Sequence, residues 1–390
     1  MQLDGIRAIA SDTRTHPIPQ PRRNAMHILV SGAGVAGLAL AADLGSRGHD
    51  VTVVELSGHL RVNGSPIDIR GDALAITEKM GLMDRIRAEQ IHATDGAVYV
   101  DRDGNPVARI PHESFSDSAD DLEIAREDLA SILASAATGA GAVIRFRDSV
   151  TALADDGEGV DVTFRESRRE RYDLVLGADG LHSAVRRLAF GPEQDYLRYL
   201  GHYVALFDLP EELRPEQANP LYNEPGRMAA VFAFKDKLIG CLAFRSAPLG
   251  YDYHDQAAYK RIIKDAYAGI TAWQVPELVA AAEADDACYF DSISQIHLPQ
   301  WHRGRIALVG DAAHCAALLS GRGTSLALTG AYYLAEELEK SPEDPTAAFA
   351  RYETRQRPYV EFSQASVKDG AAALIPDSWE AIQARNAAFS

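Results

Sequence analysis

The sequence predicts an α/β protein that contains a parallel sheet with helices and a second, separate sheet. Three observations lead to this fold class. Residues 26–56 run as strand, glycine turn, helix and strand, the pattern of a βαβ unit. Residues 196–300 instead hold β-like segments rich in aromatic side chains. Strand and helix alternate again beyond residue 300, so the middle segment is expected to form a sheet that covers part of the first unit.

Composition excludes several classes of partner. The chain has 390 residues, a formal net charge of −17 and an isoelectric point near 5.1, which argues against nucleic acid and anionic membranes as partners. The three cysteines form no CxxC pair, so neither a metal site nor a disulfide framework is predicted. This usage indicates a reducing, cytoplasmic setting. No run of eighteen apolar residues predicts a membrane span.

The first 25 residues contain no apolar run long enough for a signal peptide. We expect residues 1–25 to be a disordered leader, or the product of an upstream start codon with Met26 as the alternative start. A functional arm is the less favoured interpretation.

The first half of the chain continues the α/β pattern. Residues 27–31 and 51–55 are short apolar strands, and residues 38–44 have helical spacing. The further elements expected are a loop and helix over 64–88, a hairpin over 97–110, a helix over 121–137 entered through 123–126, and strands over 141–146, 149–164 and 172–179.

The second half begins with the aromatic-rich segments. Strands are expected over 203–209, 227–234, 237–246 and 288–296, with one helix over 252–269. The strand–helix pattern returns after residue 300. Residues 341–366 and 366–390 are both expected to be helical.

A glycine fingerprint follows the first strand. Gly32, Gly34 and Gly37, with Ala36 between the last two, are spaced to let a helix N-terminus approach a pyrophosphate. Glu55 ends the next strand about twenty residues on, where a carboxylate accepts hydrogen bonds from ribose hydroxyls. The carboxylate also disfavours a 2′-phosphate in this pocket, which leaves FAD or NAD as the bound dinucleotide.

A second motif, GADG, ends the strand that precedes residue 180. Asp179 is its acidic member, and Ser183 is the candidate N-cap of a helix that carries Arg186 and Arg187. The motif matters mainly in combination with the other two.

The third motif lies in residues 305–328, RIALVGDAAHCAALLSGRGTSLAL. Asp311 follows a buried strand and is placed to bind a ribityl or ribose hydroxyl. A glycine turn then opens a helix whose positive end can face a developing anion. The backbone of this turn is supplied by Gly321, Arg322, Gly323 and Thr324.

Three motifs in one order, GAGVAG at 32–37, GADG at 177–180 and GDAAH at 310–314, resemble the FAD-dependent aromatic hydroxylases, the single-component (class A) flavoprotein monooxygenases. The resemblance spans residues 26–365. Residues 61–71 and 122–133 are most similar to the tetracycline-inactivating branch, which confers antibiotic resistance. The combination of motifs is far more specific than any one of them.

The resemblance implies a doubly wound, Rossmann-like FAD-binding domain of the GR2 type, a mostly antiparallel β-sheet substrate domain and C-terminal helices. The expected division is an FAD-binding domain over 26–195 and 296–365, in which 95–115 adds to the substrate sheet, a substrate-binding domain over 196–295, and a C-terminal helix over 366–390.

The resemblance also implies the chemistry. FAD would be reduced by NADPH or NADH, which binds only transiently, and would then take up O2 as a flavin C4a-hydroperoxide. The substrate would be a planar, polycyclic phenol or enol, tetracycline-like or an aromatic polyketide. The chain would act as a monomer or homodimer. The protein need supply no nucleophile, in agreement with the absence of GxSxG, HExxH and P-loop motifs, so no catalytic side chain is predicted.

Several roles come from the resemblance alone. Asp68 would lie near the isoalloxazine, Arg126 would contact FAD, and Arg61 would contact the nicotinamide donor. Arg227 loosely matches a substrate-binding arginine of the branch.

The aromatic strands offer further substrate contacts. With period two, one face of residues 199–245 could line a flat apolar pocket, and Phe234 and Phe244 are the candidates. For any single aromatic residue, burial in the core is the simpler interpretation. Arg227 and Arg245 could recognise an anionic group or lie at a solvated edge.

Two features of the third motif need separate treatment. His314 and Cys315 are neighbours that cannot readily chelate one ion together, so we expect structural roles for both. The family usually has prolines after GDAAH and a Gln between the final glycines, whereas this chain has residues 316–318 as Ala-Ala-Leu and Arg322. These departures affect the flavin-side wall of the substrate pocket.

Two alternatives remain open at this stage. The chain could be a flavoprotein dehydrogenase, reductase or halogenase of the same fold without oxygen insertion, although the halogenase WxWxIP signature is absent. It could also be a non-catalytic protein that binds flavin or another ligand.

Overall fold

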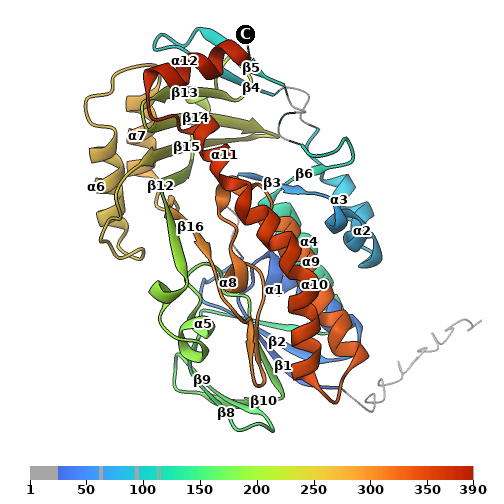
Figure 1. The fold of residues 1–390 in the computed structure, drawn as a ribbon. Coiled ribbons are helices and arrows are strands. Elements are labelled where there is room, and N and C mark those ends of the chain that lie inside the picture. Colours follow the sequence, from blue (N-terminus) through green and yellow to red (C-terminus); the bar gives the residue numbers. More distant parts are fainter. Residues whose placement is uncertain (1–24, 61–64, 93–95, 112–113, 115, 390) are drawn as a thin grey trace, which may run out of the picture.

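A computed structural model describes residues 25–60, 65–92, 96–111, 114 and 116–389 (Figure 1). The predicted leader therefore lies outside the described residues, apart from residue 25. The fold has two main sheets joined by long strands, with helices packed around both (Figure 1).

The first sheet has six strands in the order β17-β18-β11-β1-β2-β7. All neighbours pair in parallel except β17 and β18, which are antiparallel. β1 is buried over residues 28–31 and β11 throughout, as expected for parallel strands covered on both faces. The strands are β1 (His27–Ser31), β2 (Asp50–Glu55), β7 (Val143–Phe146), β11 (Leu174–Gly177), β17 (His302–Arg303) and β18 (Ile306–Leu308).

Helices pack around this sheet in two groups. α1 packs against both α4 and α9, and α10 packs on α9, whereas α5 contacts β11 and β18. Their buried side chains form one continuous core with the strands. The helices are α1 (Val35–Ser46), α4 (Arg126–Gly139), α5 (Ala184–Ala189), α8 (Asp311–His314), α9 (Gly323–Lys340) and α10 (Pro345–Ala365).

Two small antiparallel sheets flank the first. One has the order β10-β9-β8 and the other pairs β3 with β6. β3 contacts α9, so this strand pair lies beside that helix. The strands are β3 (Pro66–Ile69), β6 (Leu122–Ala125), β8 (Val150–Asp155), β9 (Val160–Phe164) and β10 (Arg169–Tyr172), and the nearby helices are α2 (Asp72–Lys79) and α3 (Met83–Ala88).

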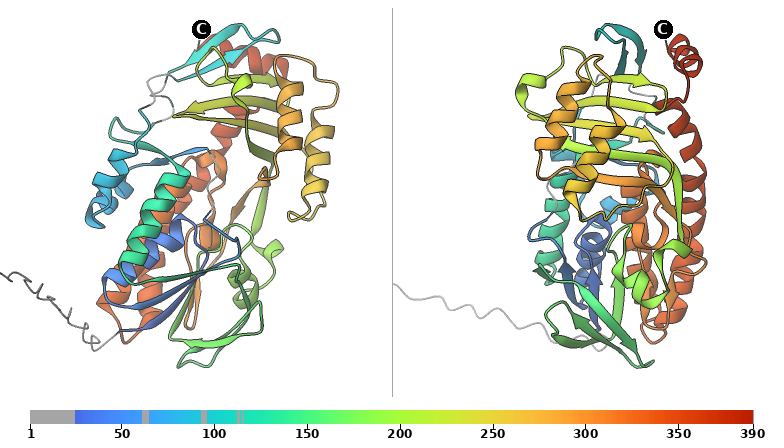
Figure 2. Two further views of the ribbon diagram at one scale, coloured as in Figure 1. Left: turned by 180° about the vertical axis from the view of Figure 1, so that it is seen from behind. Right: turned by 90° about the vertical axis from the view of Figure 1, so that its left-hand side faces the viewer.

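The second main sheet has seven strands in the order β16-β12-β15-β14-β13-β4-β5. It is antiparallel except where β13 and β4 run in parallel. Helices α6 (Gln256–Ala266) and α7 (Val275–Ala284) cover one of its faces (Figure 2). The strands are β4 (Ala97–Val100), β5 (Pro106–Ile110), β12 (Leu197–Asp208), β13 (Pro220–Glu224), β14 (Arg227–Phe234), β15 (Lys237–Arg245) and β16 (Tyr289–Ile296).

The C-terminal helices join the two parts of the molecule. α10 begins beside the six-stranded sheet and leads into α11 (Val367–Leu374) and α12 (Trp379–Ala388), which reach the seven-stranded sheet (Figures 1 and 2). The Arg385 guanidinium of α12 lies 3.4 Å from the ring centroid of Tyr99 and donates to Asn223 Oδ1 at 2.8 Å. These contacts fix α12 to strands β4 and β13.

The predicted fold class, α/β with a doubly wound cofactor domain, a mostly antiparallel second sheet and C-terminal helices, is confirmed. Several element predictions are wrong in detail. Residues 66–69 form a strand rather than a loop, residues 122–125 form a strand before the expected helix, and residues 72–88 hold two helices. A second helix, α7, lies among the aromatic strands, and residues 366–390 hold two helices rather than one.

None of the helices in the described part of the chain has both the length and the apolarity needed to cross a membrane.

Candidate functional site

The glycine fingerprint is a tight turn that only glycine permits at two positions. Gly32 has φ +106°, and a Cβ there would lie 2.4 Å from the Ala178 carbonyl oxygen. A Cβ on Gly37 would lie 1.9 Å from the Gly32 carbonyl oxygen, so helix α1 packs directly on the turn. Gly34, by contrast, faces open space and precedes α1 without a side-chain cap. The N-terminus of α1 is therefore accessible to a phosphate group.

Glu55 holds the fingerprint in place from the end of β2. Its carboxylate oxygens accept from the Ala33 N–H and the Ser57 N–H, each at 2.8 Å. Each oxygen keeps acceptor capacity for a further bond. The residue therefore fits a ribose hydroxyl beside the glycine turn.

The third motif meets the first at Ala36. A Cβ on Gly310 would lie 2.8 Å from the Ala36 Cβ, so the turn before α8 packs against the start of α1. Gly310 has φ +62°, and Asp311 follows it at the first position of α8. Asp311 is exposed at the surface, but the protein packed around it raises its pKa by desolvation, and the charge of Arg126 opposes the rise. The structure thus brings Ala36, Asp311 and Arg126 together from three separate segments.

Asp179 lies beside the fingerprint but is engaged by its own chain. It accepts from the Ser183 hydroxyl, from the Val185 N–H at 3.1 Å and from the Ser31 hydroxyl at 3.4 Å. Ser183 in turn caps α5 by accepting from the Arg186 N–H at 2.9 Å, as predicted. Asp179 therefore organises the start of α5 next to Gly32.

The N-terminus of α9 is a second accessible helix end. Gly321 has φ +61°, and the helix begins at Gly323 with no side-chain cap. A Cβ on Gly323 would meet nothing within 4 Å, and Thr324 in the first turn is half-buried. The Arg70 guanidinium lies 3.7 Å from the position that a Cβ on Gly321 would occupy.

Strand β3 places Asp68 against this helix end. Arg70 donates from its backbone N–H to Ser325 Oγ at 2.9 Å and from Nη2 to Asp68 Oδ2 at 2.7 Å. Glu123 stands directly opposite Asp68 in the β3–β6 pair. Burial and the nearby Asp68 charge raise the pKa of Glu123 to about 7. Two carboxyl groups and a guanidinium therefore share the face of β3 and β6 that points away from the core.

The departures from the family pattern occupy the segment between α8 and α9. Ala317 has φ +74° and ψ 153°, a conformation that is essentially confined to glycine. Arg322 forms an ion pair with Asp117 at 2.6 Å, and its guanidinium lies 4.9 Å from the ring centroid of Phe362. Ala317 and Arg322, the two departures described here, therefore both lie in the segment that leads to the N-terminus of α9.

His314 and Cys315 are both buried. The His314 ring packs 4.6 Å from Trp301, and its Nε2 is 3.5 Å from the Tyr352 hydroxyl. Burial lowers the pKa of His314 to about 3, and burial raises the pKa of Cys315 well above its ordinary value. Both side chains therefore stay neutral, and the geometry favours the structural roles expected for them.

The candidate substrate residues lie on two different faces of the seven-stranded sheet. Arg227 and Phe244 face α6 and α7, where Arg227 Nε donates to the Ala266 carbonyl at 2.5 Å and Phe244 packs with Tyr203. Phe234 faces the other side and packs with Ala125, the residue just before Arg126. Arg227 and Phe244 therefore lie on the sheet face that α6 and α7 cover, and Phe234 lies on the opposite face.

The face that carries Phe234 also meets the segment between α8 and α9. Ala317 and Leu319 pack against this face. The strand residues that they join include Val204, Met228, Ala230, Cys241 and Ala243. An apolar sheet face therefore lies directly against the segment that precedes the N-terminus of α9.

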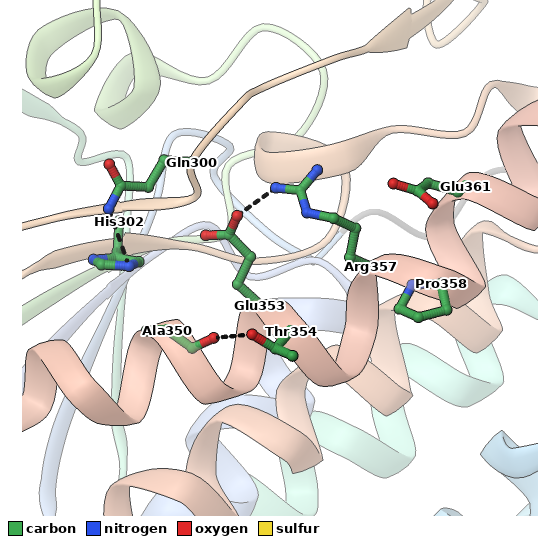
Figure 3. Close-up of a pocket in the computed structure, with 8 residues that line it drawn as sticks. All are labelled: Gln300, His302, Ala350, Glu353, Thr354, Arg357, Pro358 and Glu361. Atoms are coloured by element: carbon green, nitrogen blue, oxygen red, sulfur yellow. Dashed lines mark hydrogen bonds and ion pairs between the residues drawn. The ribbon is translucent and has the colours of Figure 1, made fainter.

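A surface groove of about 450 Å³ lies elsewhere, between β17 and α10 (Figure 3). Its walls include Gln300, His302, Glu353 and Arg357, and Arg357 forms an ion pair with Glu353 (Figure 3). None of the predicted site residues lines it. None of its lining residues belongs to a glycine motif, so we do not assign the cofactor to it.

Sequence reasoning missed two groups near the site and could not test a third. Arg70 and Glu123 were not identified, although Arg70 has the same strand parity as Asp68 and Glu123 precedes Arg126 by three residues. Period-two spacing would have found both if residues 66–69 and 122–125 had been recognised as strands. Arg61 lies outside the described residues.

These features are typical of a dinucleotide-binding fold that has a second sheet packed against it. They are the fingerprint turn, the Glu55 carboxylate, Asp311 and the two accessible helix ends. The family model described as FAD binding domain matches residues 25–362. The chain belongs to this family, and FAD is its cofactor.

Curated relatives extend over nearly the whole chain. The uncharacterised protein Rv1260 of Mycobacterium tuberculosis is 39% identical over 370 residues, which cover 91% of this chain and 97% of that protein. A flavin-dependent monooxygenase of Legionella longbeachae is 34% identical over 340 residues, 86% of each chain. The chain is thus a member of an FAD-dependent monooxygenase family.

Solved structures with more than 30% sequence identity have a similar fold. The crystal structure of tetracycline destructase Tet(55) is similar with a TM-score of 0.81 at 34% identity and covers 94% of this chain and 95% of that one. Tetracycline destructase Tet(51) gives the same TM-score of 0.81 at 31% identity, over 93% and 95%.

Proposed function

We propose that the protein is an FAD-dependent monooxygenase that uses NAD(P)H and O2, through a flavin C4a-hydroperoxide, to hydroxylate a planar polycyclic phenol or enol of the tetracycline or aromatic polyketide class. One observation carries the substrate class: the apolar face of the seven-stranded sheet lies against Ala317 and Leu319, next to the N-terminus of α9. A flat, apolar ligand suits such a face.

The residues present fit FAD. Gly34 leaves the N-terminus of α1 open for the pyrophosphate, and Glu55 is placed for a ribose hydroxyl. Asp311 with Arg126 would hold the ribityl region, and Gly323 and Thr324 would face the isoalloxazine. When bound, the flavin supplies the electron transfer and the oxygen chemistry, and the protein supplies position and exclusion of water.

The helix ends favour negative charge on the cofactor. The N-terminus of α9 presents N–H donors without a titrating group, a contribution of about 0.3–2 kcal/mol for a unit charge. Fixed donors contribute more in a dry site than in water. The 18-residue helix α9 therefore suits a reduced, anionic ring beside Gly323.

Asp68, Arg70 and Glu123 would manage protons at the same site. Glu123 has a pKa near 7, raised by burial and by Asp68, so it can hold or release a proton at neutral pH. Arg70 forms an ion pair with Asp68 at 2.7 Å beside it. We propose that these three side chains together hold a proton near the substrate.

The rest of the proposal concerns partners. Arg61 would contact the nicotinamide donor, which is NADH or NADPH, and the chain would act in the cytoplasm as a monomer or homodimer.

The decisive experiment is a panel of tetracyclines and aromatic polyketides. Substrate-stimulated NAD(P)H oxidation under ¹⁸O2, with mass spectrometry of the products, should show one labelled oxygen atom incorporated. Stimulated oxidation without label would indicate an oxidoreductase without oxygen insertion. Ligand binding without stimulated turnover would indicate a binding protein. A purified protein with no flavin spectrum and no affinity for FAD would contradict the assignment altogether.

A further inference from the structure

His182 lies between two carboxylates that come from different parts of the fold. Its Nδ1 is 2.9 Å from Glu193 Oε1, and its Nε2 is 3.1 Å from Asp291 Oδ2. Tyr253 stacks on the imidazole with ring centroids 4.1 Å apart and an interplanar angle of 7°. Glu193 follows α5 in the cofactor-binding part, whereas Asp291 lies on β16 of the seven-stranded sheet. His182 therefore bridges the two sheets.

Geometry also defines the protonation of this ring. An ionised carboxylate only accepts hydrogen bonds, so an imidazole with one carboxylate at each nitrogen must donate from both. Only the imidazolium carries two N–H groups. The Asp291 side chain is 9% exposed and that of His182 is 22% exposed, so water screens this pairing weakly.

The chain of contacts continues from Glu193 to the third motif. Glu193 Oε2 accepts from Arg186 Nη2 at 2.7 Å, and the fully buried Arg186 donates from Nη1 to the Ala312 carbonyl at 2.9 Å. Ala312 follows Asp311 in α8, a helix of only four residues. So short a helix has little stability of its own and takes its orientation from such contacts.

We propose that His182 is a positioning residue for FAD. As an imidazolium it links Asp291 of the seven-stranded sheet, through Glu193 and Arg186, to the backbone that positions Asp311. The inference rests on the proposed role of Asp311 in the FAD site. Loss of the charge on His182 would release Glu193 and Arg186 and loosen the Ala312 carbonyl. The affinity for FAD would then depend on the contact between His182 and Asp291 of the seven-stranded sheet.

The charges around His182 favour the imidazolium over a wide pH range. Burial alone would lower the pKa of His182, but the hydrogen bonds and charges of Asp291 and Glu193 raise it to about 9. Other titratable groups of the described chain near this cluster include Arg186 and Arg187 of α5, Tyr251, Tyr253, and Tyr289 of β16, whose hydroxyl donates to Asp291 Oδ2 at 3.5 Å. Because the folded-state pKa is raised, the contribution of His182 is complete below about pH 6.5, the ordinary histidine pKa, and is lost as pH rises through 9.

The test is FAD binding to apo-protein, measured by quenching of flavin fluorescence between pH 7 and 9.5. We expect the Kd of wild-type protein to rise through an inflection near pH 9. His182→Gln should bind FAD about tenfold more weakly at pH 7.5 and show no such inflection. Asp291→Asn should move the inflection to lower pH, because it removes one of the two charges that hold the proton.

Two controls separate positioning from folding. His202→Gln changes a buried histidine whose pKa is lowered by burial, and it should leave both the Kd and the pH profile unchanged. Thermal unfolding of each apo-protein identifies variants that do not fold, and Asp291→Asn then provides the test in place of His182→Gln. His182→Arg, which keeps the charge, should restore most of the affinity at pH 7.5.

The outcomes distinguish the two proposals. If wild-type apo-protein does not bind FAD, the cofactor site itself is wrong. If wild-type protein binds FAD but folded His182→Gln keeps both its Kd and its pH profile, the positioning role of His182 is overturned.

Discussion

At the scale of single residues, Asp311 is the side chain on which the cofactor assignment depends most. Desolvation by the surrounding protein raises its pKa, and the charge of Arg126 and a hydrogen bond from Cys315 oppose the rise. Asp311→Ala should weaken FAD binding by roughly ten- to a hundredfold, because a charge-assisted hydrogen bond contributes about 1.5–3 kcal/mol. The measurement is the Kd for FAD of apo-protein, with flavin content after purification as a second readout.

Asp311→Asn is the matched control for this substitution. The amide keeps the size and an acceptor oxygen, so its loss of affinity should be smaller than that of the alanine variant. Unchanged flavin occupancy in Asp311→Ala would remove the role that we give to the third motif.

Ala317 is the residue with the most strained backbone in the candidate site. Its φ of +74° with ψ 153° is a conformation that costs a non-glycine residue about 1–3 kcal/mol. Ala317→Gly should therefore raise the free energy of unfolding by about 1 kcal/mol. Ala317→Pro, which brings back a residue type that the family favours here, should destabilise the protein because proline fixes φ near −65°.

Urea unfolding of the apo-proteins tests both substitutions. Ala316→Gly is the control, since Ala316 is buried in the same segment and is absent from the described residues with positive φ. An Ala317→Pro protein as stable as wild type would show that this segment does not have the conformation described.

Local spacing explains which site residues could be predicted. Gly37 and Ser183 act through contacts set within a few residues, and the sequence pattern predicts their structural roles correctly. The network around His182 depends on Asp291, which lies 109 residues away. No local pattern carries such a contact, so it required the structure.

At the scale of elements, the β3–β6 strand pair holds a carboxyl group that titrates near neutral pH. Glu123 has a folded-state pKa near 7, above its ordinary value of 4.5, because of burial and Asp68. The folded protein therefore binds a proton more tightly than the unfolded chain, and this contribution to stability is lost as pH rises from 4.5 through 7. Glu123→Gln has no titrating group at this position, so its stability should not fall in this way as pH rises.

The Tm of Glu123→Gln apo-protein should equal that of wild type near pH 4.5 and exceed it increasingly up to pH 8. Asp68→Asn is the informative companion, because removal of the neighbouring charge should lower the pKa of Glu123 and shift the wild-type profile to lower pH. A constant Tm difference at every pH would show that Glu123 titrates normally.

The same strand pair shows why element prediction failed there. β3 and β6 are only four residues long, and each continues into a helix almost at once. Alternation over four residues cannot be distinguished from the start of a helix by periodicity alone. The longer strands β14 and β15, of eight and nine residues, were predicted almost to the residue, whereas β12 was predicted over 203–209 and begins already at Leu197.

At the scale of the whole molecule, the seven-stranded sheet separates two layers with different tasks. One face packs with α6 and α7, and the other faces the segment between α8 and α9. Sequence predicts the alternation but not which parity faces the cofactor, because both faces are apolar. This is why Phe244 and Phe234 were predicted to share a role although they lie on opposite faces.

These two phenylalanines make a matched pair that tests the arrangement. Phe234 and Phe244 are 6% and 4% exposed, so replacement by leucine should cost each variant a similar stability of about 1–2 kcal/mol. Phe234→Leu alone should raise the KM for a planar substrate several-fold, because only that side chain lies on the face near Ala125 and Arg126. Phe244→Leu should leave KM within about twofold of wild type, since Tyr203 and α6 enclose it. Substrate-stimulated NAD(P)H oxidation gives KM and kcat, and urea unfolding gives the stability of the same proteins. Equal KM values in the two variants would place the substrate elsewhere, whereas a rise confined to Phe244→Leu would put it on the helix-covered face.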